Sequence, residues 1–323
     1  MTTGLARMKR SAAIATGLVL LALMAYARCQ TLPPGESPLR ISVDVSLVVL
    51  QATVTDRQGS AVANLGEQDF EVYENGVLQQ IQLFKNEDVP VAVGLIVDHS
   101  TSMSPKIAEV TAAARTFVRS SNREDEMFVV NFNETASLGL PATIPFTNST
   151  AELERAILNK PTTGQTALYD AIALGLARLQ AASRDKKALI VVSDGGDNAS
   201  RQNLGQIMKL AGQSRAVIYT VGLFDQNDPD RNPGVLNHLA RATGGETFRP
   251  GQLDEVPAIC ERIAHDIRHQ YTIGYVPANP ARDGSYRAIR VVARTKGQGK
   301  LSVRTRTGYV AVSNPKPGVQ AGK

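Results

Sequence analysis

One apolar run constrains the fold of this chain more than any other feature. Residues 91–97, Val-Ala-Val-Gly-Leu-Ile-Val, are apolar without a break and end at an acid. Such runs are typical of strands buried on both faces, as in parallel sheets covered by helices on both sides. The sequence Asp98-His99-Ser100-Thr-Ser102 follows directly. We therefore expect oxygen-bearing side chains at the carboxyl end of a central strand, where open α/β sheets bind ligands.

The same pattern, an apolar run that ends in polar residues, repeats further along the chain. A second apolar run, 188–192, ends in Ser193-Asp194-Gly195, and the segments between the apolar runs carry apolar residues at helical spacing. Further strands are predicted at 127–132 and 216–221. Helices are predicted around 105–118, 153–158, 168–179, 204–210, 235–242 and 256–267. Strands separated by helices predict a doubly wound, mostly parallel sheet of the Rossmann-like kind in residues 90–270.

Both flanks of this α/β region alternate between apolar and polar residues, which is typical of strands. Neither flank, 40–89 or 271–311, is large enough to form a robust core by itself. The first contains eight acidic and three basic residues, and the second contains eight basic residues and one acidic residue. We predict that they pair in one small β-sandwich, with 301–310 as its last strand, and that the α/β domain is inserted between them. In the alternative interpretation, the Arg-rich strands expose a polyanion-binding face.

The N-terminus has the pattern of an export signal. Basic residues within the first ten positions precede the apolar run 12–27, which ends in the cleavage-like triplet Ala25-Tyr-Ala27. Residues 1–27 are therefore predicted to be a signal peptide, and 28–39 a linker. An uncleaved membrane anchor is the alternative. Either reading predicts an extracytoplasmic protein, in the periplasm, in the cell envelope or secreted.

Composition excludes several classes of function. The formal net charge is +5, and removal of the three basic residues of the signal segment lowers it to +2, so overall basicity does not indicate a nucleic-acid partner. Trp is absent, which weakens recognition by aromatic stacking. The two cysteines, Cys29 and Cys260, form neither a metal cluster nor a dense disulfide framework. The tail 312–323 is rich in Pro and Gly and is predicted to be disordered.

A third polar loop completes a candidate site. Thr163-Gly-Gln165-Thr166 precedes a predicted helix, and the carboxyl ends of neighbouring parallel strands meet at one edge of a sheet. All the candidate ligands carry hard oxygen donors, which favours Mg²⁺, Mn²⁺ or Ca²⁺ over zinc. The candidate metal ligands are Asp98, Ser100, Ser102, Thr166 and Asp194. His99, Gln165 and Gly195 are candidates for the rim around the ligand, with the side chain of His99 expected to be exposed.

These three loops resemble the metal-ion-dependent adhesion site of von Willebrand factor A domains and integrin I domains. The flanks, with Asp69-Phe-Glu-Val-Tyr-Glu-Asn-Gly76 and Tyr271-Thr-Ile-Gly-Tyr275, look similar to exported VWFA-related Acidobacterial domain proteins. The resemblance implies that Ser100, Ser102 and Thr166 bind the metal directly and that the two acids act through water. It also implies a non-catalytic protein-binding module, which takes an Asp or Glu of a protein partner as the last metal ligand.

Two other functions remain open. A scaffold component of an envelope or ATP-driven complex is the first, although the chain has no phosphate-binding G-x-x-x-x-G-K-[ST] loop of its own. A metal-assisted hydrolase is the second. The sequence has no G-x-S-x-G elbow and no H-E-x-x-H motif, and His99 beside Ser100 is poorly placed as its base. The acidic segment 228–234 is similar to a calcium loop in composition, but its Gly is displaced, so an ordinary helix-capping loop is the preferred interpretation.

Overall fold

The computed structural model describes residues 47–224, 231–295 and 300–311. The predicted signal peptide, the linker 28–39 and the tail 312–323 lie outside these ranges. Among the described residues, no helix is both long enough and apolar enough to cross a membrane.

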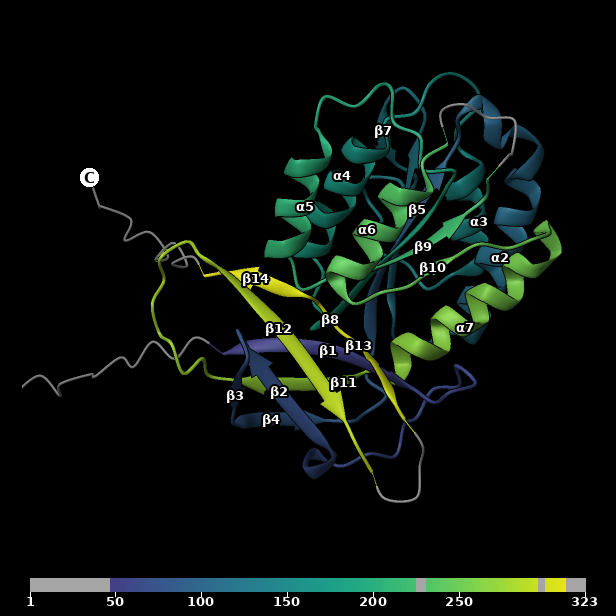
Figure 1. Cartoon of the computed structure of the whole chain (residues 1–323). Helices are drawn as coiled ribbons and strands as arrows, with labels where there is room; N and C mark the ends of the chain where they lie inside the picture. Colours follow the sequence, from purple (N-terminus) through teal and green to yellow (C-terminus); the bar gives the residue numbers. More distant parts are fainter. Residues whose placement is uncertain (1–46, 225–230, 296–299, 312–323) are drawn as a thin grey trace, which may run out of the picture. The chain divides into compact units, whose positions relative to one another are not determined.

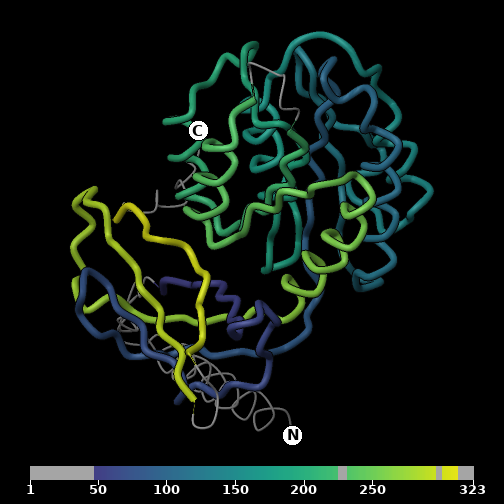
Figure 2. Tube along the Cα trace, turned by 45° about the vertical axis from the view of Figure 1, so that its right-hand side comes forward, coloured from purple at the N-terminus to yellow at the C-terminus, as the bar shows by residue number. Residues whose placement is uncertain are grey.

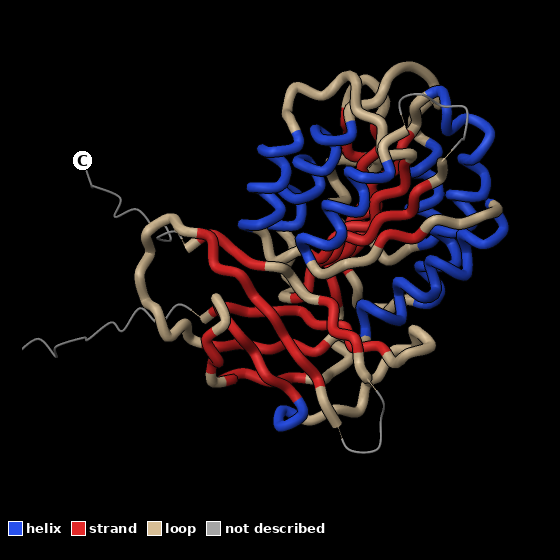
Figure 3. The backbone as a smooth tube through the Cα atoms, in the orientation of Figure 1, coloured by secondary structure: helices blue, strands red, loops and turns tan. Residues whose placement is uncertain are grey.

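A six-stranded sheet forms the centre of the α/β region, and helices cover both of its faces (Figures 1 and 3). Its strand order is β10-β9-β8-β5-β6-β7, with all neighbours parallel except the last pair. The expected mostly parallel sheet is therefore confirmed, with β7 as an antiparallel edge strand. The strands are β5 (Val91–Asp98), β6 (Glu126–Phe132), β7 (Ala136–Leu138), β8 (Lys186–Ser193), β9 (Val217–Gly222) and β10 (Thr247–Phe248).

Two helical layers enclose this sheet. Helix α2 packs against α3 and α7, and helix α5 packs against α4 and α6. The helices are α2 (Ile107–Ser120), α3 (Thr150–Leu158), α4 (Leu168–Gln180), α5 (Leu204–Gln213), α6 (Pro233–Thr243) and α7 (Val256–Arg268). Every residue of β5 is buried, as the unbroken apolar run predicts. Helix α4 approaches this strand closely at Gly175, where a Cβ atom would lie 2.7 Å from Cδ1 of Ile96.

The two flanks pair with each other, as predicted from their size and charge. One four-stranded sheet has the order β13-β1-β11-β4, and the other has the order β14-β12-β2-β3. Strands of the N-terminal and C-terminal flanks lie side by side in both sheets, as the purple-to-blue and green-to-yellow segments of Figure 2 illustrate. The strands are β1 (Val48–Thr55), β2 (Phe70–Glu74), β3 (Val77–Gln79), β4 (Ile81–Lys85), β11 (Tyr271–Tyr275), β12 (Tyr286–Ala293), β13 (Ser302–Arg304) and β14 (Gly308–Val310).

A second hydrophobic core fills the sandwich. It includes Leu50 on β1, Val72 on β2 and Ile289 on β12, all of which are buried. A polar contact also joins the two sheets, since Glu74 on β2 accepts a hydrogen bond from the hydroxyl of Tyr275 on β11 at 2.8 Å. Within its own sheet, Glu74 also accepts from the hydroxyl of Tyr309 on β14 at 3.0 Å. The sandwich thus depends on residues that are separated in sequence by the whole α/β region.

Two local expectations were wrong. The single strand expected at 301–310 is split into β13 and β14, which belong to different sheets. The chain bends between them, where Arg306 forms an isolated bridge with Thr243 of α6. The helix expected around 105–118 begins later: Thr101–Lys106 form a 3₁₀ turn (η2), and α2 starts at Ile107 without a side-chain cap.

Candidate metal site

The first loop of the candidate site begins at the buried carboxylate of Asp98. This residue ends β5, which lies between β8 and β6, and its side chain is fully buried. Its Oδ1 accepts a hydrogen bond from the Ser100 amide at 2.8 Å, and its Oδ2 accepts one from the Ser193 hydroxyl at 2.6 Å. Both carboxylate oxygens are therefore held in place, one by the first loop and one by β8.

Hydroxyl and carboxylate oxygens of the loop after β5 and the loop after β8 meet beside Asp98. The Ser102 hydroxyl donates to Oδ2 of Asp194 at 2.6 Å and lies 3.2 Å from the Ser100 hydroxyl. Asp194 follows β8 directly, and its Oδ1 accepts from the Gly196 amide at 3.1 Å. Four of the five predicted ligands thus form one hydrogen-bonded cluster at the carboxyl ends of β5 and β8.

The loop that carries Thr166 is tied to the same edge by backbone contacts. The Thr163 amide donates to the His99 carbonyl at 2.8 Å, and the Thr101 amide donates to the Gly164 carbonyl at 3.2 Å. Thr166 itself is only 7% exposed. The structure therefore brings the three predicted loops to one edge of the sheet, with Thr166 on the loop beside the cluster.

Thr166 is held by a segment that the sequence analysis did not identify. Its amide donates to Oδ1 of Asn198 at 2.9 Å, and its carbonyl accepts from the amides of Asn198 (3.0 Å) and Ala199 (3.1 Å). The Asp197 carboxylate accepts from the Tyr169 amide in the first turn of α4 at 3.1 Å. Ser193 was also missed as a partner of Asp98. The signal for both was present in the polar run Ser193 to Ser200, but local sequence does not show which residues that run would contact.

The electrostatics of the cluster favour a cation. Burial raises the pKa of Asp98 to about 6; hydrogen bonds from Ser193 and Ser100 oppose this shift, and the charge of Asp194 adds to it. In the part of the chain that the structure describes, neither acid takes part in a salt bridge. Two acids without a positive partner, surrounded by hydroxyl oxygens, fit a hard divalent ion such as Mg²⁺. The same described ranges contain no group of three or more His, Cys, Asp or Glu residues arranged for a metal.

Of the three predicted rim residues, only Gln165 is exposed. The expectation of an exposed His99 was wrong, because its amide donates to the Phe132 carbonyl at 2.6 Å and so extends the pairing of β5 with β6. Its side chain is fully buried, with Nδ1 3.3 Å from the Thr162 hydroxyl. Gly195 is buried too: its φ is +82°, and a Cβ there would lie 2.4 Å from the Asn232 carbonyl oxygen.

Part of the calcium-like segment 228–234 lies outside the described residues. In the described part, Asn232 caps α6 by accepting from the Val235 amide at 3.2 Å. Cys260 is buried on α7, and burial raises the pKa of its thiol to about 12.

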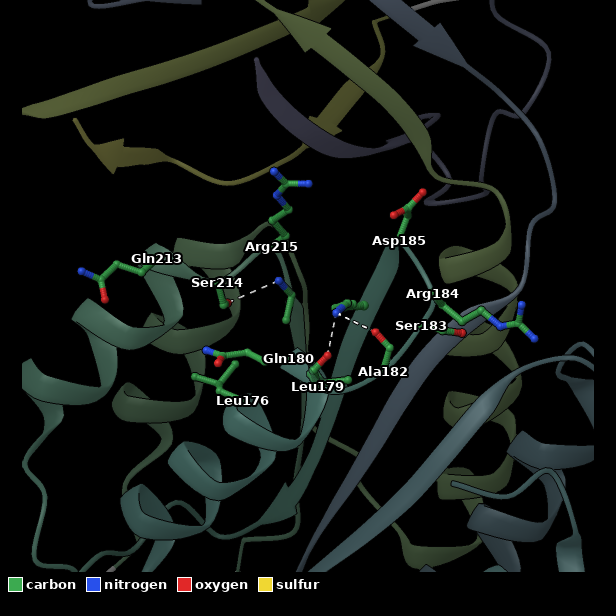
Figure 4. A pocket seen from close by; sticks show the side chains of 12 residues that line it. Leu176, Leu179, Gln180, Ala182, Ser183, Arg184, Asp185, Gln213, Ser214 and Arg215 are labelled. Carbon is green, nitrogen blue, oxygen red and sulfur yellow. Dashed lines mark hydrogen bonds between the residues drawn. The ribbon is translucent and has the colours of Figure 1, made fainter. Parts of the chain in front are cut away.

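A hollow at the other end of the sheet offers no comparable chemistry. It has a volume of about 360 Å³ and lies between the loops that lead into β8 and β9 (Figure 4). The Lys187 ammonium on its wall donates to the carbonyls of Leu179 (2.6 Å) and Ala182 (3.2 Å), so this charge is already engaged. The site at the carboxyl ends of the strands is therefore the stronger candidate.

A known protein family matches the region that contains the candidate site. Residues 93–196, which include all five predicted ligands, match the family model described as von Willebrand factor type A domain. The chain therefore contains a von Willebrand factor type A domain. No curated protein matches the chain.

Several solved structures are similar in fold. A von Willebrand factor type A protein from Catenulispora acidiphila is 15% identical, with 81% of this chain and 73% of that chain covered and a TM-score of 0.49. The vWF domain of the type V pili tip protein Mfa5 from Porphyromonas gingivalis is 14% identical (56% and 95% covered, TM-score 0.47). The PilB minor pilin from Streptococcus sanguinis is 12% identical (57% and 63% covered, TM-score 0.46). At these identities the similarity concerns the fold alone.

Proposed function

We propose that this protein is a non-catalytic, divalent-cation-dependent binding module that captures an Asp or Glu side chain of a protein partner. The observation that carries the proposal is the cluster in which the Ser102 hydroxyl lies 2.6 Å from Asp194 and 3.2 Å from the Ser100 hydroxyl, beside the buried carboxylate of Asp98. It supports an oxygen-rich cation site at the edge where α/β sheets bind ligands.

The set of metal ligands suits a site that binds an external carboxylate better than a closed site that only holds a structural ion. Ser100, Ser102 and Thr166 would hold Mg²⁺, and Asp98 and Asp194 would act through water, as in the family that the motif resembles. When bound, Mg²⁺ would supply a positive centre for an incoming carboxylate. Because the three direct ligands are neutral hydroxyls, they would leave much of the ion's charge uncompensated. Ser102 is partly exposed and Ser100 is buried, so an external carboxylate would approach from the side of Ser102.

The geometry supports binding rather than hydrolysis. A serine nucleophile requires a base within hydrogen-bond reach, and the neighbouring imidazole is the obvious candidate. The His99 ring instead contacts Thr162, while the Ser100 hydroxyl contacts Ser102. An external location is proposed on the N-terminal sequence alone, with its basic start, its apolar run 12–27 and its Ala25-Tyr-Ala27 triplet.

The test compares Asp98→Ala and Thr166→Ala with Asp185→Ala, which removes an exposed acid from the opposite end of the sheet. Mg²⁺ binding is measured by calorimetry, and partner capture from the native cell envelope is measured in Mg²⁺ and in EDTA. We expect Asp98→Ala and Thr166→Ala to lose both Mg²⁺ binding and partner capture, and Asp185→Ala to keep both. Capture that resists EDTA and survives both site substitutions would contradict the proposal.

A further inference from the structure

Two histidines lie one turn apart at the C-terminal end of α7, far along the chain from the oxygen site. The rings of His265 and His269 are stacked, with centroids 3.9 Å apart and planes inclined by 24°. The first side chain is exposed and the second is partly exposed. Residues four apart on a helix share one face, so both imidazoles face the same solvent region.

One contact fixes the tautomer of His269. Its Nδ1 lies 2.7 Å from the main-chain oxygen of His265. A carbonyl oxygen only accepts hydrogen bonds, so Nδ1 carries the hydrogen and donates it. In the neutral ring, Nε2 then carries the free lone pair. Histidines that bind metals are commonly oriented in this way, with the other ring nitrogen donating to a carbonyl or carboxylate.

The surroundings are compatible with a cation. The two rings line an open hollow of about 560 Å³, together with Glu261, which is exposed one turn before His265. The neighbouring Arg268 is neutralised by Asp88, 2.5 Å away. The C-terminal end of a helix also carries partial negative charge, which favours a bound cation.

We propose that His265 and His269 form a binding site for an imidazole-preferring divalent ion, Zn²⁺ in the first place, separate from the oxygen site. Imidazole nitrogens are good ligands for Zn²⁺, Ni²⁺ and Cu²⁺ and poor ligands for Mg²⁺. The protein supplies two ligands, and water completes the coordination. The bound ion links the last two turns of α7, just before the chain enters β11 of the sandwich.

The test uses the full chain without a histidine tag, stripped of metals and kept in excess Mg²⁺ so that the oxygen site is occupied. Zn²⁺ is titrated by calorimetry against the parent protein, His265→Ala, His269→Ala and His238→Ala. The last variant is the matched control, because His238 is an exposed histidine on another helix, α6. Alanine favours helix, so none of these substitutions should disturb folding.

We expect one Zn²⁺ per parent chain and a loss of affinity of at least about tenfold in each α7 variant, since removing even a hydrogen-bond partner of a metal ligand costs that much. The control and an Asp98→Ala variant should bind Zn²⁺ like the parent. A parent chain that takes up no Zn²⁺, or α7 variants that bind as it does, would overturn the proposal. Either result leaves the Mg²⁺-dependent function untouched.

Discussion

At the scale of single residues, Asp98 shows how the site combines burial with charge. Its carboxylate is fully buried and accepts two hydrogen bonds, one at each oxygen. Two hydrogen bonds do not offset the loss of hydration, so burial raises its pKa to about 6. Ionisation of Asp98 is therefore unfavourable in the metal-free protein, and a bound cation would stabilise its charged form.

From the raised pKa of Asp98 we predict that the free energy of unfolding, measured in EDTA, depends on pH. Because the folded-state pKa lies above the unfolded value, the protonated form stabilises the fold; this contribution is present below about pH 4 and is lost as the pH rises through about 6. The expected loss is up to about 3 kcal/mol between those limits. Urea unfolding across this range checks it, and Asp98→Asn, which cannot titrate, should flatten the curve. An equally steep curve in that variant would assign the effect to another group.

At the scale of elements, α4 is capped from outside its own sequence. Its N-cap position is Ala167, which offers no side-chain acceptor. The first-turn amides of Tyr169 and Asp170 instead meet the side chains of Asp197 (3.1 Å) and Ser200 (3.1 Å). The loop after β8 therefore both carries Asp194 and fixes the start of α4, so it also holds the loop that carries Thr166.

This link predicts that Asn198 positions Thr166. Asn198→Ala leaves the nearly buried Thr166 amide without its acceptor, which costs about 1–3 kcal/mol. We expect lower thermal stability and weaker Mg²⁺ binding, measured by calorimetry. Asn198→Asp keeps the accepting oxygen and should restore binding, whereas Asn237→Ala on α6 serves as a neutral control. Equal Mg²⁺ affinity in Asn198→Ala and the parent would show that the link does not position the ligand.

At the scale of the whole chain, several arginines of the C-terminal flank pair with other side chains of the protein. Arg287 is buried 3.5 Å from Glu74, which belongs to the N-terminal flank. Arg304 reaches Asp266 of α7 at 2.5 Å, and so joins the sandwich to the α/β region. Arg290 stacks over the Tyr73 ring at 4.3 Å on the exposed face. This distribution favours paired flanks over a broad polyanion-binding face.

The buried pair of Glu74 and Arg287 predicts that contacts between the two flanks contribute to the free energy of unfolding. Glu74→Gln removes the charge opposite Arg287 and should lower the free energy of unfolding by about 3 kcal/mol. Glu71→Gln, on the same strand, is the matched control, because its contact with Arg294 is longer (3.8 Å) and largely exposed and should be worth little. Urea unfolding of the two variants compares them. Equal losses would mean that the buried pair contributes no more than the surface pair.

The architecture could be predicted because it follows from local patterns. Unbroken apolar runs at β5 and β8 indicate strands buried on both faces, and helical spacing between them indicates crossovers. Parallel strands joined by crossovers bring their carboxyl ends to one edge, so the sequence alone predicts that the loops of Asp98, Thr166 and Asp194 lie together.

What local patterns do not contain is the direction of a side chain in a loop, since contacts from distant segments decide it. His99 is buried because its backbone pairs with Phe132, and Asn198 matters because it meets Thr166 across the site. The strand expected at 301–310 divides where Arg306 meets α6. The sequence alone therefore determined the order of elements and the chemistry at the sheet edge. The tertiary structure decided which polar groups face one another, because their hydrogen-bond partners lie far away along the chain.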